Sequence, residues 1–451
     1  MDSTLPVDAQ KSALKKIIDD VARNIGINKK FHAWMGFLTL LLFVCLYAYY
    51  IQLRDGLGVA GIRDYVSWGM YIANFVFFVA SSLIGMLITA VLGLSGVKWI
   101  TPVARIAEII AIGFAAVAGL VIVSDMGRPE RLVYVFIYGR IQSPILWDVT
   151  VVTTYVLISL ILLYLPLIPD LKILSRNPML PKWLQKTYEL LSINWKGTNE
   201  QYQLLHKAIK IMSVLIVPVA LAIHTVTSWL FASTSRVGWD STIFGPYFVT
   251  GAFVAGTAFL IIAMYFFRKN YKLHDYLTDF HFDKLGKLLV LVSLVYLYFN
   301  INEFLVPAYK LKAHDAVHLK ALFSGHHAPM FWSVQLFGLL IPIVLMLFKK
   351  FRKPLPLMLI SLFVVIGSWF KRYLIVVPTQ EHPFLPIQNV PENFKLYQPT
   401  LIETAITVAS FVLVLMIITV LSKAFPIITI WETAHEKGIH EPEKLSIDKA
   451  E

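Results

Sequence analysis

The chain has 451 residues, of which 57% are hydrophobic and 15% are charged. The mean hydropathy is +0.67, and apolar runs of about twenty residues, long enough to cross a bilayer as helices, recur along the chain. This composition excludes an ordinary soluble domain and predicts an all-α polytopic membrane protein. We assign the formal charge of +12 to loops on the cytoplasmic side and expect no nucleic-acid partner. The single cysteine, Cys45, excludes an internal disulfide and a thiolate-held Fe–S cluster.

Residues 1–30 are polar and precede a full-length apolar segment, so we expect no cleavable signal peptide. Apolar side chains at Leu14, Ile17, Ile18 and Val21 share one helical face with lysines opposite, which predicts an amphipathic lead-in. About ten membrane spans follow. The predicted spans are 31–53, 66–95, 103–124, 145–168, 208–233, 245–267, 286–306, 329–349, 355–376 and 400–423.

The loops between these spans differ in charge from one side to the other. Lys349, Lys350 and Arg352 follow the eighth span, for example, whereas Arg54 is matched by Asp55 after the first. Lysine and arginine accumulate on the cytoplasmic side of membrane proteins. We therefore expect a multi-pass protein of the cell inner (cytoplasmic) membrane, with both termini in the cytoplasm and the loops after the odd-numbered spans outside.

An internal repeat divides the chain into similar halves. Three pairs of features recur in order and at nearly constant spacing: Trp68–Tyr71 with Phe244–Tyr247, Asp125 with Glu303, and Trp147 with Trp332. The two copies have the same orientation because four spans separate them, unlike an inverted transporter repeat. This repeat predicts two four-helix bundles with one extra helix at each end. The predicted units are a cytoplasmic amphipathic lead-in (1–30), an extra first helix and outer loop (31–65), a first bundle (66–243), a second bundle (244–380), a last transmembrane helix (381–425) and a cytoplasmic tail (426–451).

Polar side chains are concentrated in residues 124–148, between two apolar runs. Bare charge in hydrocarbon is costly, so the segment must lie at an interface or line a cavity, although an ordinary hairpin loop also fits. A pocket with aromatic walls, an amide and carboxylates suits a quinone, because its oxygens need polar partners and oxidation of a quinol releases protons. The residues that would form such a pocket at the outer end of the first bundle are Trp68, Tyr71, Asn74, Asp125, Trp147 and Asp148.

Each of these residues also has a simpler interpretation. Tryptophan and tyrosine commonly form the aromatic belt at the membrane surface. Asp125 and Asp148 could instead form ion pairs with Arg105, Arg128 or Arg140.

Further polar groups lie within the spans. Glu108 is three residues from Arg105, and we expect an intrahelical ion pair, with a proton-path entry as the alternative. His224 and Glu303 are further candidates for a proton path. Glu403, at the start of the last span, is interpreted as a solvated side chain.

Bis-histidine haem ligation requires two histidines at one depth on facing helices, and His224 has no evident partner. The histidines at 314–327 lack the spacing of a metal site. We therefore expect no haem and no metal in this chain.

Four motifs together resemble the NrfD/PsrC family, the polysulfide reductase-type quinone-interacting membrane subunits. They are Trp-Gly-x-Tyr from Trp68, DMGRPER from Asp125, QSPILWD from Gln142 and NINEFLVP from Asn300. The ten-span form is similar to the larger members found in alternative complex III and in menaquinol-linked redox complexes of sulfate reducers. The resemblance covers roughly residues 60–380.

The resemblance implies a haem-free subunit that binds menaquinone or ubiquinone at the outer side of the first bundle. It implies an Fe–S partner subunit on that face, beside other membrane and cytochrome subunits. By position it adds Arg128, Gln142 and Ser143 to the quinone-binding residues. Smaller members place a histidine near Asn74, so Asp125 or Asp148 becomes the catalytic proton acceptor here.

The sequence thus predicts a membrane subunit that oxidises a quinol, or reduces a quinone, within an oxidoreductase complex and is inactive alone, with proton translocation as a further possibility. A secondary transporter is one alternative, which helices broken at mid-membrane would favour. A purely structural anchor for peripheral redox subunits is the other.

Overall fold

The structure is a computed structural model that describes residues 7–234, 236–383, 388–436 and 438–439. This part of the chain is helical and contains no strand. The helices are α1 (Val7–Ala22), α2 (Lys29–Asp55), α3 (Met70–Leu94), α4 (Thr101–Ser124), α5 (Tyr134–Ile137), α6 (Pro144–Ser175), α7 (Lys182–Leu191), α8 (Asn199–Ala232), α9 (Phe244–Asn270), α10 (Asp279–Lys310), α11 (Ala313–Phe323), α12 (Ala328–Ser333), α13 (Ile341–Leu347), α14 (Pro354–Gln380), α15 (Leu401–Ala424) and α16 (Ile430–Glu436).

Each predicted span falls on one long helical stretch. Among the described residues nine stretches are long and apolar enough to cross a membrane, and α3 adds a shorter apolar run over Met70–Leu83. The stretch Ala328–Leu347, which corresponds to the eighth predicted span, joins α12 and α13 through a π-helical segment, Val334–Leu340, without a break. The prediction of an all-α polytopic membrane protein is therefore confirmed.

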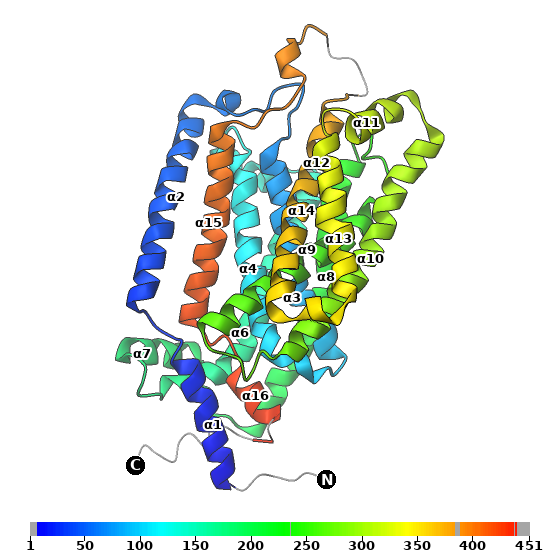
Figure 1. The fold of residues 1–451 in the computed structure, drawn as a ribbon. Helices are drawn as coiled ribbons and strands as arrows, with labels where there is room; N and C mark the ends of the chain where they lie inside the picture. Colours follow the sequence, from blue (N-terminus) through cyan, green and yellow to red (C-terminus); the bar gives the residue numbers. More distant parts are fainter. Residues whose placement is uncertain (1–6, 235, 384–387, 437, 440–451) are drawn as a thin grey trace.

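The long helices alternate in direction, so the two ends of the molecule differ (Figure 1). One end carries α1, α7 and α16, and we call it the terminal side. The other end carries the connections after α2, α4, α8, α10 and α14, and we call it the distal side. Residues 124–148 lie on the distal side, opposite α1 and α16, as the loop charges predict.

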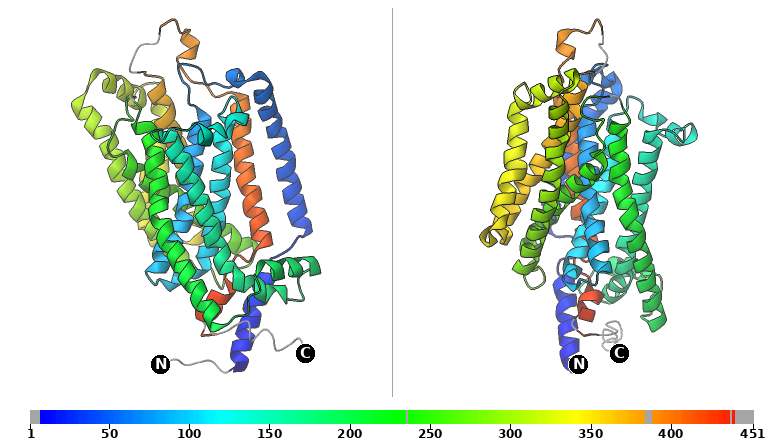
Figure 2. Two further views of the ribbon diagram at one scale, coloured as in Figure 1. Left: turned by 180° about the vertical axis from the view of Figure 1, so that it is seen from behind. Right: turned by 90° about the vertical axis from the view of Figure 1, so that its right-hand side faces the viewer.

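The long helices pack as two neighbouring rings of four. Helices α3, α4, α6 and α8 contact one another in a ring, and α9, α10, α13 and α14 form a second ring. The rings meet where α3 packs on α9 and α14. Helix α15 packs on α2, α3 and α4 and so completes the first ring's outer wall (Figures 1 and 2). The division into separate domains stays a prediction.

Two shorter segments differ in detail from the sequence analysis. The lead-in forms α1, whose Leu14, Ile17 and Val21 side chains are buried and which packs against α16. Residues 309–328, expected as a long outer loop, hold the 11-residue helix α11. A helix there brings His318 into the protein, where it is 7% exposed.

Candidate functional site

Tyr71 is the centre of a buried hydrogen-bond cluster on the distal side. It lies in the first turn of α3 and is 1% exposed. Its hydroxyl donates to Oε1 of Gln52 on α2 at 2.5 Å, and Nε2 of Gln52 donates to the carbonyl of Ser124 at 2.7 Å. Because buried polar groups are normally paired, these bonds fix the distal ends of α2, α3 and α4 around one phenol. Gln52 was not predicted, since a glutamine in an apolar span carries no motif.

Asn74 lies one turn further along α3, and both ends of its amide are occupied. The indole N–H of Trp369 on α14 donates to Asn74 Oδ1 at 2.7 Å. Asn74 Nδ2 donates to the hydroxyl of Thr407 on α15, also at 2.7 Å. The amide therefore joins three helices, and a quinone oxygen could bind to it only by replacing one of these partners.

Asp125 caps the C-terminal end of α4 beside this cluster. Its Oδ1 atom is buried and accepts no hydrogen bond from the described residues. Burial first, and then the nearby Glu403 carboxylate, raise the pKa of Asp125 to about 7. Asp125 is also an electrostatic neighbour of Tyr71. A carboxyl group with a free oxygen that titrates near neutral pH is suited to accept and release a proton.

Trp68 forms the aromatic wall next to the start of α3. Its ring stacks on Trp239 at a centroid distance of 5.8 Å and meets Phe231 edge-on at 5.7 Å. Its backbone N–H donates to Oε1 of Gln380, the last residue of α14, at 2.9 Å. Trp68 is half-buried, so its position results from packing between the two rings of helices.

Asp148 lies in a different environment from Asp125. It is 4% exposed and sits between α6 and α8, where the hydroxyl of Thr227 donates to its Oδ1 at 2.5 Å. The neighbouring Trp147 is exposed; it donates its indole N–H to the carbonyl of Ile141 and meets Trp229 of α8 edge-on. Among the described residues neither aspartate forms one of the ion pairs with arginine that the sequence left open: Arg105 pairs with Glu108 and Asp170, and Arg128 and Arg140 are exposed.

The hairpin between α4 and α6 is largely exposed. Arg128 and Gln142 are exposed and Ser143 is half-buried at the N-terminus of α6, and the hairpin projects sideways on the distal side (Figure 2, right view). The structure thus brings together Tyr71, Asn74 and Asp125 and places Arg128 and Gln142 on the outer surface.

The prediction of a solvated Glu403 is wrong. Its side chain is not solvated: Glu403 is 0% exposed and accepts hydrogen bonds from the backbone N–H groups of Gly61 and Thr400 and from the hydroxyl of Tyr397. The Thr400-x-x-Glu403 pattern forms a capping box at the start of α15. That pattern predicts a helix start, but the burial depends on how the segment before α15 folds back.

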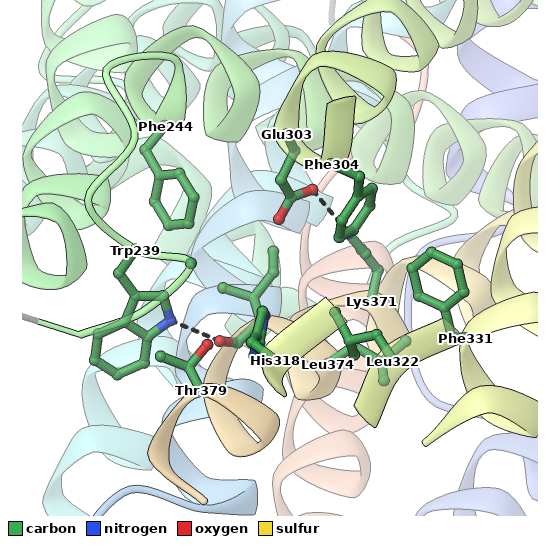
Figure 3. A pocket seen from close by; sticks show the side chains of 12 residues that line it. Trp239, Phe244, Glu303, Phe304, His318, Leu322, Phe331, Lys371, Leu374 and Thr379 are labelled. Atoms are coloured by element: carbon green, nitrogen blue, oxygen red, sulfur yellow. Dashed lines mark hydrogen bonds and ion pairs between the residues drawn. The ribbon is translucent and has the colours of Figure 1, made fainter. Parts of the chain in front are cut away.

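Glu303, the counterpart of Asp125 in the repeat, is held in an ion pair. Lys371 Nζ lies 2.9 Å from Glu303 Oε2, with the two side chains 4% and 10% exposed. Figure 3 shows this pair beside Phe304, His318 and the indole of Trp239, which donates to the carbonyl of Ile375 at 2.7 Å. These residues surround a cavity of about 10 Å³, room for one water molecule.

The second ring repeats the tyrosine arrangement of the first. The Tyr247 hydroxyl donates to Oδ1 of Asn300 at 3.0 Å, and Nδ2 of Asn300 donates to Oε1 of Gln335 at 2.7 Å. Tyr71 and Tyr247 therefore each donate to a buried side-chain amide near the distal end of a ring. The difference is that the carboxylate of the second ring is paired with Lys371, whereas Asp125 is not paired with a lysine.

A charged cluster lies near the terminal side of the first ring. Arg105 Nε is 3.4 Å from Glu108 Oε2, which confirms the predicted intrahelical ion pair, and the other arm of Arg105 is 3.5 Å from Asp170 Oδ2 on α6. Asp170 also accepts the N–H groups of Ile430 and Trp431 and so caps α16. All three charged side chains are at most 5% exposed. Asp170 was not predicted because its partners are distant in sequence.

A cavity of about 680 Å³ reaches Glu108 from the terminal side. Its wall combines apolar side chains of α4 and α6 with His206 and Lys210 of α8 and Glu432 of α16. Glu108 is 4% exposed, and its Oε2 atom accepts no hydrogen bond from the described residues. The cavity therefore leads to a buried carboxyl group.

His224 is buried in α8 at 2% exposure, and its Nε2 atom has no hydrogen-bond partner among the described residues. Among all the residues that the structure describes, no group of three or more His, Cys, Asp or Glu side chains is arranged to hold a metal ion.

Comparison with known proteins identifies the family. Residues 58–383 match the family described as "Polysulphide reductase, NrfD". A selenate reductase subunit of Mesobacillus selenatarsenatis is 25% identical over 413 residues, which is 88% of this chain and 95% of that protein. A putative dimethyl sulfoxide reductase membrane subunit of Halobacterium salinarum is 31% identical over 307 residues, 67% of this chain and 62% of that protein.

A third relative is the integral membrane subunit of menaquinone reductase from Nitratidesulfovibrio vulgaris. It is 23% identical over 402 residues, 85% of this chain and 88% of that protein. The match to the family covers well over half of the sequence and includes both rings of helices. This multi-pass membrane protein therefore belongs to the polysulphide reductase NrfD family.

Proposed function

We propose that this chain is the quinone-binding membrane subunit of an oxidoreductase complex and that it oxidises a quinol, or reduces a quinone in reverse, at the distal side. The observation that carries the proposal is the buried Tyr71–Gln52–Asp125 cluster in a family member whose relative is named a menaquinone reductase subunit. The proposed substrate is menaquinone or ubiquinone. In this assignment the distal side is the outer face of the cytoplasmic membrane.

Oxidation of a quinol releases two protons and two electrons. Asp125 is the proposed acceptor of the first proton, since its free Oδ1 atom lies next to the Tyr71 cluster. The electrons leave to an Fe–S cluster of a partner subunit docked on the distal side, because one cysteine cannot hold such a cluster in this chain. The half-buried Trp68, stacked on the buried Trp239, supplies apolar surface for the quinone ring.

Asp125→Asn in the whole complex tests this assignment. Loss of a general base typically lowers turnover by about 10²–10⁴-fold, and we expect a fall in that range for oxidation of menadiol, with subunit composition unchanged. Asp64→Asn is the matched control, since Asp64 is an exposed aspartate on the same side. Asp148→Asn is expected to lower turnover less, because Thr227 already occupies one oxygen of Asp148. Full turnover in both Asp125→Asn and Asp148→Asn would remove the site.

Proton translocation coupled to this reaction is a second proposal, supported by the cavity of about 680 Å³ that reaches Glu108. Glu108, His224 and Glu303 are the proposed relay groups. Proteoliposomes containing the complex should release protons on the distal side in excess of those from the quinol. Glu108→Gln should abolish the excess while menadiol oxidation continues. Release equal to the quinol protons alone would reject this proposal.

Two alternatives predict different results. A secondary transporter would move a solute without a redox partner, and the continuous helical stretches of the described spans lack the mid-membrane breaks that such a site uses. A purely structural anchor would hold the redox subunits without binding quinone. Binding of menaquinone to the isolated subunit in nanodiscs, lost in Asp125→Asn, supports the quinone site against both.

A further inference from the structure

Helix α7 (Lys182–Leu191) lies crosswise to the long helices at the terminal side and has no role in the proposed function (Figure 1; Figure 2, left view). Leu184 and Tyr188, on one side of it, are 6% and 1% exposed and belong to the hydrophobic core. Trp183 and Leu190, in contrast, are 60% and 79% exposed. The protein therefore covers only part of the apolar surface of this helix.

The uncovered apolar side chains lie between the buried face of α7 and its polar face. Because a helix has about 3.6 residues per turn, Trp183 and Leu190 share a face that adjoins the buried one. Lys182 and Lys186 are one turn apart and share the polar face on the other side of Trp183 and Leu190. An apolar side wider than the surface that it packs against is typical of a helix lying in a membrane interface.

Two hydrogen bonds fix the depth of α7 relative to the membrane spans. The hydroxyl of Tyr188 donates to the carbonyl of Ala424, the last residue of α15, at 2.5 Å. The hydroxyl of Tyr164 on α6 donates to the carbonyl of Leu191 at 2.6 Å. Helix α15 is one of the stretches long and apolar enough to cross a membrane. Helix α7 therefore lies at the level where this span ends, which is the level of the membrane surface.

The segment that carries α7 is basic. Residues 176–198 contain four cations and one acid, and all four cations are exposed. The acid, Glu189, pairs with Lys172 near the end of α6, outside this segment. The four cations are therefore not balanced by an acid of their own segment, which favours an anionic partner. They are Arg176, Lys182, Lys186 and Lys196.

We propose that α7 binds anionic phospholipids of the terminal-side leaflet: Trp183 and Leu190 contact the acyl chains, and the four cations bind the phosphate groups. Tryptophan favours the headgroup level of a bilayer because its ring is apolar and its N–H is polar. Lysine and arginine side chains are long enough to keep their charge in water beside such apolar contacts. This inference does not depend on the proposed function.

A phospholipid accounts for these observations better than the other possible partners. A free phosphate ion would account for the exposed cations but not for the exposed Trp183 and Leu190. A docked protein would account for the apolar side chains, but a helix fixed beside the end of a span already borders the lipid. A phospholipid supplies an acyl chain and an anionic phosphate together at this depth.

The test places a fluorophore on Leu190→Cys in a Cys45→Ser background, with the full-length protein in nanodiscs. Phosphatidylglycerol, which is anionic, and phosphatidylcholine, which is neutral, each carry a nitroxide quencher on the same acyl carbon and are compared at equal mole fractions. Both lipids should quench the fluorophore, and the anionic one should quench it more. Attraction to one cation strengthens binding by about fivefold. We expect a local enrichment of phosphatidylglycerol of at least this size in low salt, falling toward one in high salt.

Lys182→Gln combined with Lys186→Gln should remove most of this enrichment. Lys269→Gln combined with Lys272→Gln is the matched control, since it removes two exposed cations at the end of α9 and should leave the enrichment unchanged. A fluorophore on Leu40→Cys, an exposed position of α2, should be quenched equally by the two lipids.

Two results overturn the proposal. Absence of quenching at Leu190 by either lipid would mean that protein or water covers this face of α7. Equal quenching by the two lipids in low salt would mean that the cations select no anionic headgroup. The salt dependence measured with all lysines present gives the same decision if the double variant fails to fold.

Discussion

Asp125 shows how one residue combines a cost in stability with a use in chemistry. Its pKa is raised to about 7, first by burial and then by Glu403, so the folded protein holds a proton that the unfolded chain loses near pH 4. Between these values the folded state binds more protons, and its stability falls as the pH rises. Asp125→Asn should therefore be stabilised relative to the unmodified protein by an amount that grows from pH 4 to 7. Thermal unfolding in detergent across this range measures it; a difference independent of pH would contradict the assignment.

Asn74 should be sensitive to substitution because both ends of its amide are used. Asn74→Ala leaves the half-buried Trp369 indole N–H without its acceptor and removes one bond to the Thr407 hydroxyl, which still donates to the carbonyl of Glu403. A buried donor left unpaired costs about 1–3 kcal/mol. We expect a clear loss in the free energy of unfolding, measured by denaturant titration, and a smaller loss for Trp369→Phe, which removes one bond only. Equal stability of Asn74→Ala and the unmodified protein would show that these bonds contribute little.

Residue types and spacing were enough to predict part of the site. Tyr71 and Asn74 were found because an aromatic ring and an amide at the outer end of a span suit a quinone, and Asp125 because a charge at a span end needs an explanation. The burial of Glu403 was missed because it depends on Tyr397, and the segment that carries Tyr397 has no periodic pattern. Gln52 and Asp170 were missed because their partners are on helices far away in sequence.

At the scale of whole helices, length and hydropathy were sufficient to predict where the ten spans lie in the sequence, but not which helices pack against one another. The last span was expected as an addition at the end of two bundles. Helix α15 instead packs on α2, α3 and α4 and brings Thr407 and Glu403 to the site. Such contacts depend on side-chain shape along the whole helix, which apolar periodicity does not encode.

One helix crossing depends on two glycines. A Cβ atom at Gly367 of α14 would lie 2.4 Å from the Cα of Gly338 in the π-helical segment. Gly367→Leu should separate these helices, at a cost typical of overpacking, about 1–3 kcal/mol or more. Gly119→Leu is the control, because a Cβ there meets no atom within 4 Å. Thermal stability of both variants in detergent measures the effect; equal values would contradict this close contact.

For the whole molecule, the sidedness of the membrane decides which aqueous space Asp125 faces. The basic loops predict that the terminal side is cytoplasmic. In a Cys45→Ser background, Gln142→Cys places a thiol on the exposed distal hairpin and Lys186→Cys places one on exposed α7 (Figure 1). A membrane-impermeant maleimide added to intact cells should label the first and spare the second, and inside-out vesicles should give the reverse.

The same experiment separates two kinds of failure. The opposite labelling pattern would move the quinone reaction and its Fe–S partner to the cytoplasmic face while leaving the fold intact, because the two positions would still lie on opposite sides. Labelling of both thiols from one side would instead contradict the alternation of the long helices, on which the terminal and distal sides are defined. Because the cavity that reaches Glu108 opens on the terminal side, only the predicted pattern lets the proposed relay through Glu108 take up protons from the cytoplasm while quinol oxidation releases its protons outside.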